Sequence, residues 1–135
     1  KNLMRPVHVT AADINKDGKE DYVVCEFGNL VGALSWLENK GNGKYEYHLI
    51  RVAPGAIQTY ITDYNHDGLP DIWALFAQGN EGIFLFTNKG DELLIQNRFY
   101  NFRHRMVHHR LSLMILIKMV CLIFFTPAVI TLIFQ

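Results

Sequence analysis

Short apolar runs separated by glycine-containing turns recur through the first part of the chain. Residues 22–27 and 33–37 precede an Asn-Lys-Gly turn, and residues 72–77 and 83–87 precede the same turn sequence. Runs of this length, rich in β-branched and aromatic residues, are typical of strands, and glycine supplies the positive φ that such turns need. No amphipathic helical period occurs before residue 98. The pattern predicts an all-β fold.

The spacing of the runs indicates a repeat. The first copy continues into residues 45–50, whose alternating aromatic and branched residues suit a further strand. A unit of about fifty residues with three or four strands has the size of a propeller blade. We therefore predict two consecutive blades of an incomplete β-propeller. The predicted core positions are Cys25, Trp36, Trp73, Phe84 and Phe86.

Each copy contains a nine-residue acidic loop of the pattern D-x-N-x-D-G-x-x-D. The first loop is residues 13–21 and the second is residues 63–71. Oxygen-bearing side chains stand at every second position before a glycine turn. Asp and Asn also form Asx-turns without any ion, but three carboxylates within nine residues repel one another unless a cation neutralises them.

Calcium is the cation that this pattern favours, because Ca²⁺ takes six to eight oxygen ligands from short flexible loops. The predicted ligands are the side chains at positions one, three, five and nine and the carbonyl at position seven. His66 stands at a non-ligand position. In the first loop the predicted ligands are Asp13, Asn15, Asp17, Lys19 and Asp21, and in the second they are Asp63, Asn65, Asp67, Leu69 and Asp71.

These features resemble a known family. The acidic loop entering a strand, followed by Phe27-Gly28 and by the sequence W-L-E-N-K-G, is similar to the FG-GAP/VCBS repeat. The second copy departs from it with Gln78-Gly79. The resemblance implies an integrin-α-like β-propeller with calcium in its loops. It covers roughly residues 5–95, as two repeats at about 5–52 and 55–95 within a domain of residues 1–98.

Composition narrows the function. The 135 residues carry 13 basic and 13 acidic side chains, which argues against nucleic acid as a partner. No nucleophile elbow, phosphate loop or HExxH motif occurs, so we predict that the chain is not an enzyme. Closed propellers need about four to eight blades. We expect the sequence to be a fragment of a longer chain.

The tail, residues 99–135, differs from the repeats. A basic stretch precedes residues 111–135, which are almost wholly apolar. One interpretation is a membrane anchor at residues 111–135. Lys118 and Pro127 interrupt that span, and its orientation would place the acidic loops in the cytoplasm, where free Ca²⁺ is scarce.

A shifted reading frame is the other interpretation of this tail, which can form a helix by default. Read from the third base of each codon, Met114-Ile115 gives Asp and Met119-Val120 gives Gly, five codons later. Lys118-Met119 then permits Asp at the fifth position. The tail is therefore predicted to be an out-of-frame translation of a third repeat.

Three functions remain open at this point. The first is a non-catalytic calcium-binding propeller module of a larger secreted protein, which serves adhesion or binds a protein or glycan outside the cytoplasm, in the extracellular space or the periplasm. The second is the propeller part of a secreted polysaccharide-active enzyme. The third is a tail-anchored membrane protein, which depends on an in-frame tail.

Overall fold

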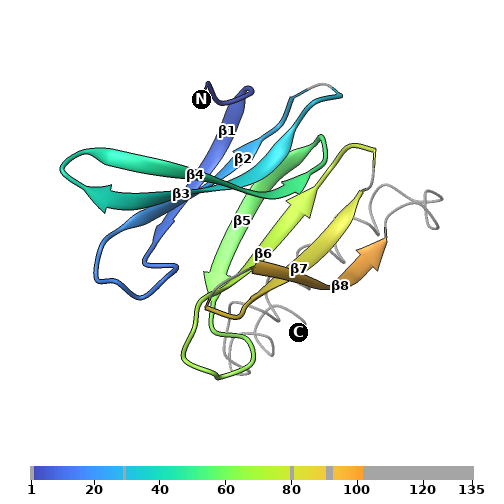
Figure 1. Ribbon diagram of the computed structural model, residues 1–135. Helices are drawn as coiled ribbons and strands as arrows, with labels where there is room; N and C mark the ends of the chain where they lie inside the picture. The colour runs from blue at the N-terminus through green and yellow to red at the C-terminus, as the bar shows by residue number, and fades with distance from the viewer. Residues whose placement is uncertain (1, 29, 80, 91–92, 102–135) are drawn as a thin grey trace, which may run out of the picture. The chain divides into compact units, whose positions relative to one another are not determined.

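The protein folds into β-strands, which the computed structural model describes over residues 2–28, 30–79, 81–90 and 93–101. The strands form two antiparallel sheets, ordered β1-β2-β3-β4 and β5-β6-β7-β8 (Figure 1). The all-β prediction is confirmed, and the two sheets are consistent with two propeller blades. The strands are β1 (Pro6–Ala12), β2 (Asp21–Glu26), β3 (Ala33–Gly41), β4 (Lys44–Val52), β5 (Ala56–Thr62), β6 (Asp71–Phe76), β7 (Gly82–Asn88) and β8 (Leu93–Asn101).

The sequence repeat is also a repeat in strand register. Ala12 pairs with Asp21 in the first sheet, and Thr62 pairs with Asp71 in the second. Both pairs stand where a nine-residue loop joins its two strands. The first hairpin of each sheet also carries a register shift near the beginning of its first strand. The two loops therefore leave and enter their sheets at equivalent positions.

The two sheets share one hydrophobic core, which the inner face of each sheet lines. Phe76 and Phe86 are the largest of the fully buried side chains there, and their burial removes two aromatic rings from water. Of the predicted core positions, Cys25, Trp73, Phe84 and Phe86 are buried, and Trp36 is partly buried. The cluster comprises Ile14, Val23, Cys25, Leu34, Ala53, Ala56, Ile72, Ala74, Phe76, Phe84 and Phe86.

Polar contacts also join the two sheets. The Thr10 and Thr59 hydroxyl oxygens lie 2.8 Å apart, which links β1 to β5. The Asn88 side-chain amide donates to the Ile14 carbonyl at 2.8 Å, so the end of β7 is joined to the first acidic loop. The Arg51 guanidinium lies 3.9 Å from the centre of the Phe84 ring, within cation–π range.

Cys25 is a buried core residue, as predicted, and burial raises the pKa of its thiol to about 12. Because the thiolate is the reactive form, we expect Cys25 to react about a thousandfold more slowly at pH 8 in the folded protein than in denaturant. The measurement is the rate of labelling by a thiol reagent in a Cys121→Ser variant, where Cys25 is the remaining cysteine. Fast labelling in native buffer would show that Cys25 is accessible.

The last described strand continues past residue 98, the boundary predicted from sequence. β8 extends to Asn101 because its end pairs with β7, Tyr100 opposite Ile83 and Asn101 opposite Gly82. The frameshift, helix and membrane-anchor predictions for the rest of the tail fall on residues 102–135, outside the described residues. In the part of the chain that the structure describes, no helix has the length and hydropathy of a membrane span.

Candidate metal centre

The first acidic loop connects β1 to β2 and is folded by bonds between its own backbone amides and its own side chains. Asp13 accepts from the Asp17 amide through Oδ1 at 3.0 Å and from the Gly18 amide through Oδ2 at 2.9 Å. Asn15 Oδ1 accepts from the Asp17 amide at 3.1 Å, and Asp17 Oδ1 accepts from the Lys19 amide at 2.9 Å. The Asn15 and Asp17 bonds are Asx-turn bonds, to the amide two residues on, whereas the two Asp13 bonds reach the amides four and five residues on. Together they bring positions one, three and five around the same turn.

The second loop, between β5 and β6, repeats this arrangement bond by bond. Asp63 accepts from the Asp67 amide at 3.1 Å and from the Gly68 amide at 2.9 Å. Asn65 Oδ1 accepts from the Asp67 amide at 3.1 Å, and Asp67 Oδ1 accepts from the Leu69 amide at 2.9 Å. The recurrence of four bonds at equivalent positions shows that the pattern D-x-N-x-D-G specifies one loop conformation.

The ninth position of each loop is a fully buried aspartate that clamps the loop to its sheet. Asp21 Oδ2 accepts from the Ile14 amide at 3.1 Å and Oδ1 accepts from the Asn39 amide at 2.8 Å. In the second loop Asp71 accepts from the amides of Tyr64 and Asn88, both at 2.9 Å. A buried carboxylate is stable when such charge-assisted hydrogen bonds replace its hydration. Position nine therefore has a structural role in addition to its predicted ligand role.

Two positions of each loop adopt a left-handed backbone conformation. Gly18 and Gly68 have φ values of 82° and 87°, as the turn prediction requires. Position four is also left-handed, with φ of 61° at Lys16 and 60° at His66. The type of residue at position four gives no signal of this, because neither Lys nor His is a glycine substitute. Both side chains are exposed, so His66 is solvated, as predicted.

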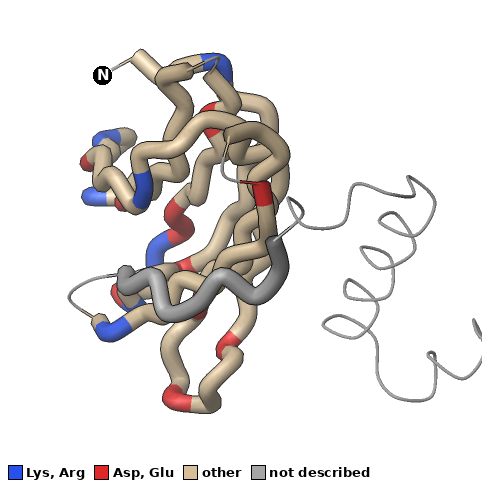
Figure 2. Tube along the Cα trace, turned by 90° about the vertical axis from the view of Figure 1, so that its right-hand side faces the viewer, with Lys and Arg blue, Asp and Glu red and all other residues tan. Residues whose placement is uncertain are grey.

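The electrostatics of the two loops differ at position seven. Lys19 Nζ lies 2.6 Å from Asp17 Oδ2, and hydrogen bonding from Lys19 lowers the pKa of Asp17 below its usual value. Leu69 provides no such charge, and the pKa of Asp67 is lowered mainly by the hydrogen bond from the Leu69 amide. Both carboxylates are therefore ionised at neutral pH. Figure 2 shows acidic and basic positions interspersed along the described part of the trace.

The oxygen atoms that the side chains of both loops offer as ligands fit a calcium ion. The side-chain donors of each loop are three carboxylates and one carboxamide, all of them oxygen ligands, which is the set that Ca²⁺ prefers over nitrogen or sulfur. A carboxylate oxygen that accepts one amide hydrogen bond keeps further lone pairs for a cation. The structure thus brings positions one, three and five together at the turn and ties position nine to the start of the loop.

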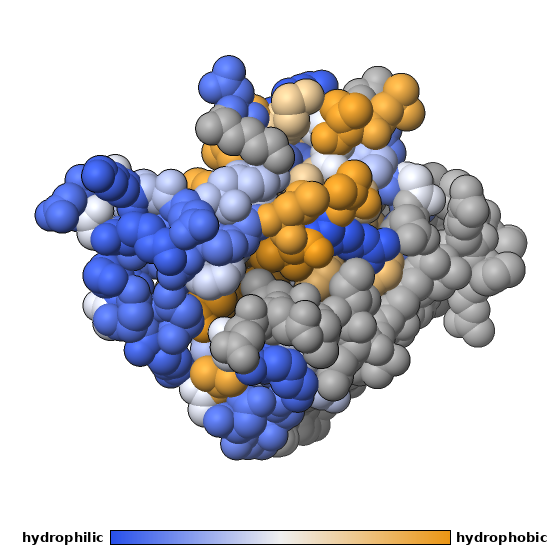
Figure 3. All heavy atoms as spheres, viewed as in Figure 1, coloured by the Kyte–Doolittle hydropathy of each residue, from blue (hydrophilic) through white to orange (hydrophobic). Residues whose placement is uncertain are grey.

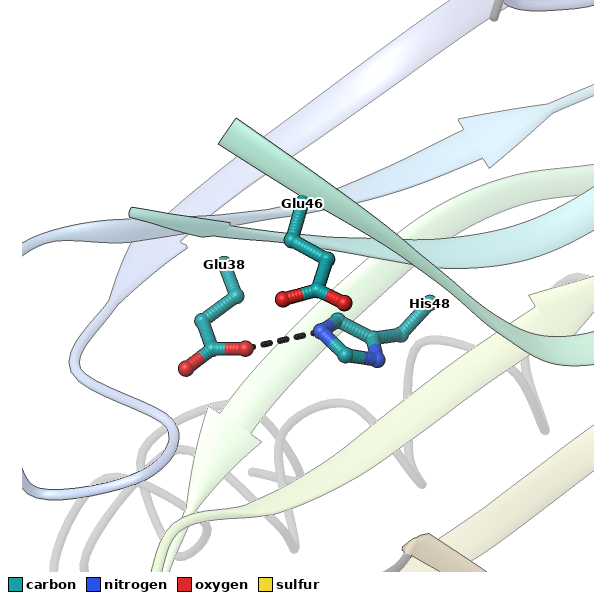
Figure 4. A group of neighbouring side chains, drawn as sticks. All are labelled: Glu38, Glu46 and His48. Atoms are coloured by element: carbon teal, nitrogen blue, oxygen red, sulfur yellow. Dashed lines mark hydrogen bonds and ion pairs between the residues drawn. The ribbon is translucent and has the colours of Figure 1, made fainter. Parts of the chain in front are cut away.

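A second group of side chains of the types that bind metals lies on the β3–β4 hairpin, whose surface is hydrophilic (Figure 3). Glu38, Glu46 and His48 bring one ligand atom each within 4.8 Å of one another, and among the described residues this is the group with that spacing (Figure 4). Sequence reasoning missed it. The available signal was the alternation of residues, which places Glu46 and His48 on one face of the strand predicted at residues 45–50. The strand register then places Glu38 opposite Glu46.

Lys40 already supplies this hairpin group with a cation. Its Nζ lies 2.7 Å from Glu38 Oε1 and 3.1 Å from Glu46 Oε2, and His48 Nε2 lies 2.8 Å from Glu38 Oε2. Hydrogen bonding to Lys40 lowers the pKa of Glu38, and hydrogen bonding to Glu38 raises the pKa of Lys40. An ammonium held between two carboxylates supplies the positive charge that a metal ion would bring. The group is therefore an ion-pair network in this structure.

The comparisons with known proteins bear on the acidic loops. Residues 13–74 match the family model of the FG-GAP-like repeat, a span that contains both nine-residue loops and the strands between them. No curated protein and no solved structure gives a significant match to the chain. The matched segment contains the two loops, whose conformation and strand register recur in the structure. Residues 13–74 are therefore an FG-GAP-like repeat, the family that the acidic loops and their strands resemble.

Proposed function

We propose that the chain is a non-catalytic calcium-binding module of a larger secreted β-propeller protein. The observation that carries the proposal is the recurrence of one loop conformation in both copies. In each copy the equivalent side-chain oxygens accept hydrogen bonds from the equivalent backbone amides. A loop needs only one or two Asx-turns to reverse the chain. Asn makes an Asx-turn as well as Asp does, so the negative charges at positions one, five and nine favour a bound cation that neutralises them.

In this proposal each loop residue has a defined task. The side chains of Asp13, Asn15 and Asp17 would supply oxygens from the loop, and Asp21 would supply one from the start of β2. The equivalent residues of the second loop would do the same. Calcium, when bound, supplies the positive charge that neutralises these carboxylates and joins the loop to its sheet. The Lys19 and Leu69 carbonyls are the proposed backbone ligands.

The proposed location is outside the cytoplasm, in the extracellular space or the periplasm. Loops of this charge suit extracellular calcium modules, which bind at about 10⁻⁴ to 10⁻³ M. The module would rigidify a propeller whose surface binds a protein or glycan and so serves adhesion. The support for this proposed role is that residues 13–74 match the FG-GAP-like repeat, since FG-GAP repeats are typically propeller repeats of larger proteins.

Calcium should stabilise the folded chain. If each loop binds one ion, calcium at tenfold above Kd adds about 1.4 kcal/mol per site to the free energy of unfolding, because the ion binds the folded loop better than the unfolded chain. Thermal unfolding with and without calcium measures this. We expect the double substitution Asp17→Ala and Asp67→Ala to abolish most of the increase in Tm, because both loops lose their position-five carboxylate.

The matched control changes the same loops at a position that is not a ligand. The variant Lys16→Asn and His66→Asn keeps position four compatible with its left-handed backbone, since Asn tolerates that region. It should keep the full calcium response. An equal response in the Asp17→Ala, Asp67→Ala variant would show that the loops are turns and not calcium sites.

A further inference from the structure

We infer that Glu38 is a positioning residue for the first calcium loop, an inference that rests on the proposed function. The Asn15 amide nitrogen Nδ2 donates to Glu38 Oε1 at 2.9 Å, from the loop to strand β3. That bond leaves the other end of the same carboxamide, Oδ1, facing the loop, where it accepts from the Asp17 amide at 3.1 Å. Glu38 thus selects the orientation of Asn15 in which the oxygen, the atom able to bind Ca²⁺, belongs to the loop.

Glu38 can fix Asn15 because it is itself held in place. Its side chain is largely buried, and Oε1 is engaged by Lys40 as well as Asn15. Oε2 is engaged by His48 (Figure 4). His48 in turn stacks on Trp36, with ring centres 4.5 Å apart. The hairpin network is therefore a rigid support for one residue of the loop. Support of this kind lowers the entropy that a ligand loses on binding an ion.

The second loop lacks this support, which provides an internal comparison. Leu37 pairs with Tyr22 and Phe86 pairs with Ile72, so Thr87 takes the position in β7 that Glu38 takes in β3. The Thr87 hydroxyl has no hydrogen-bond partner among the described residues.

The amide of Asn65 in the second loop bonds instead within its own loop. Its Nδ2 donates to Asp67 Oδ2 at 2.8 Å, whereas the Asn15 amide of the first loop reaches a strand. The Asn65 bond occupies an oxygen of a proposed ligand, and the Asn15 bond does not. This difference assigns to Glu38 an effect on the first loop alone.

The test measures calcium binding at the first loop in the full chain, with the second loop inactivated by Asp63→Ala and Asp67→Ala. In that background, titration calorimetry with Ca²⁺ gives the Kd of the first loop. We expect Glu38→Ala to weaken binding about tenfold, at the lower end of the effect of removing a partner of a metal ligand. Glu38→Gln, whose Oε1 can still accept from Asn15, should restore most of the affinity.

The control is Glu46→Ala, which removes a carboxylate from Lys40 without touching Asn15 and should leave Kd unchanged. The ¹⁵N resonances of the Asn15 side-chain amide, recorded without calcium, report the bond directly and should shift in Glu38→Ala but not in Glu46→Ala. A Glu38→Ala variant that unfolds at a lower temperature but binds Ca²⁺ with unchanged Kd would overturn the positioning role and leave the proposed function standing. No calcium binding in a background that remains folded would overturn this inference together with the proposed calcium site of the first loop.

Discussion

Replacing Asp21 by alanine should lower the free energy of unfolding of the calcium-free protein by about 2 to 6 kcal/mol. The reason is that its two carboxylate oxygens accept from the amides of Ile14 and Asn39. Each buried donor left without a partner costs about 1 to 3 kcal/mol. Asp21 is fully buried, so water does not replace the lost acceptors at once. Chemical denaturation of the calcium-free protein measures the loss.

Two further variants show whether the loss of stability in Asp21→Ala comes from the lost hydrogen bonds or from the lost negative charge. Asp21→Asn keeps the shape and one acceptor oxygen, and it should cost about half as much as Asp21→Ala. Asp17→Ala removes an exposed loop carboxylate and should change the calcium-free stability little, because surface substitutions typically have effects within about 0.5 kcal/mol. If Asp17→Ala and Asp21→Ala are equally destabilising without calcium, the buried clamp is not what distinguishes position nine.

Replacing Asn88 by alanine should lower the free energy of unfolding by about 2 to 4 kcal/mol and loosen the junction between the two sheets. Its amide donates to the carbonyls of Ile14 at 2.8 Å and Pro70 at 3.2 Å, and its Oδ1 accepts from the Gly90 amide at 2.8 Å. The bond to Ile14 joins β7 of the second sheet to the acidic loop of the first sheet, and Asn88 is almost fully buried. Denaturant unfolding measures the stability. The rate of hydrogen exchange at the Ile14 amide, in the first acidic loop, reports how often the junction between the sheets opens.

Asn39 provides the matched control for this junction. It stands at the equivalent end of β3, where its amide donates to the Glu20 carbonyl at 3.1 Å and its Oδ1 accepts from the Gly41 amide at 2.9 Å. Both of these bonds stay within the first sheet. Asn39→Ala should therefore cost less than Asn88→Ala and leave hydrogen exchange at Ile14 unchanged. Equal losses in the two variants would mean that the bond between the sheets adds nothing to stability.

The double role of position nine affects how calcium binding is tested. Asp21 and Asp71 are both clamps of the fold and proposed ligands, so their replacement removes stability and a ligand together. Asp17 and Asp67 bond to backbone amides of exposed turns. Their replacement changes the proposed calcium site with little effect on the fold. Variants at position five, and not at position nine, therefore separate metal binding from folding.

The sequence by itself determined the strands and the conformation of the loops. Runs such as residues 22–27 become strands because their apolar residues are buried in the sheet, and the glycine of each loop adopts the positive φ that reverses the chain. The loop bonds join residues two to five positions apart, so the residue types at those positions are enough to specify them. For the same reason the second copy could be predicted from the first. The ligand set itself remains a prediction.

Only the tertiary structure decided what lies next to each loop. Glu38 is joined to Asn15, and Asn88 is joined to Ile14 across the two sheets. Contacts between residues so far apart depend on strand register and on how one sheet packs against the other, which are properties of the whole fold. The end of β8 at Asn101 was decided in the same way, by pairing with β7. Short-range hydrogen bonds are thus encoded locally, whereas the groups that support the loops are brought together by packing.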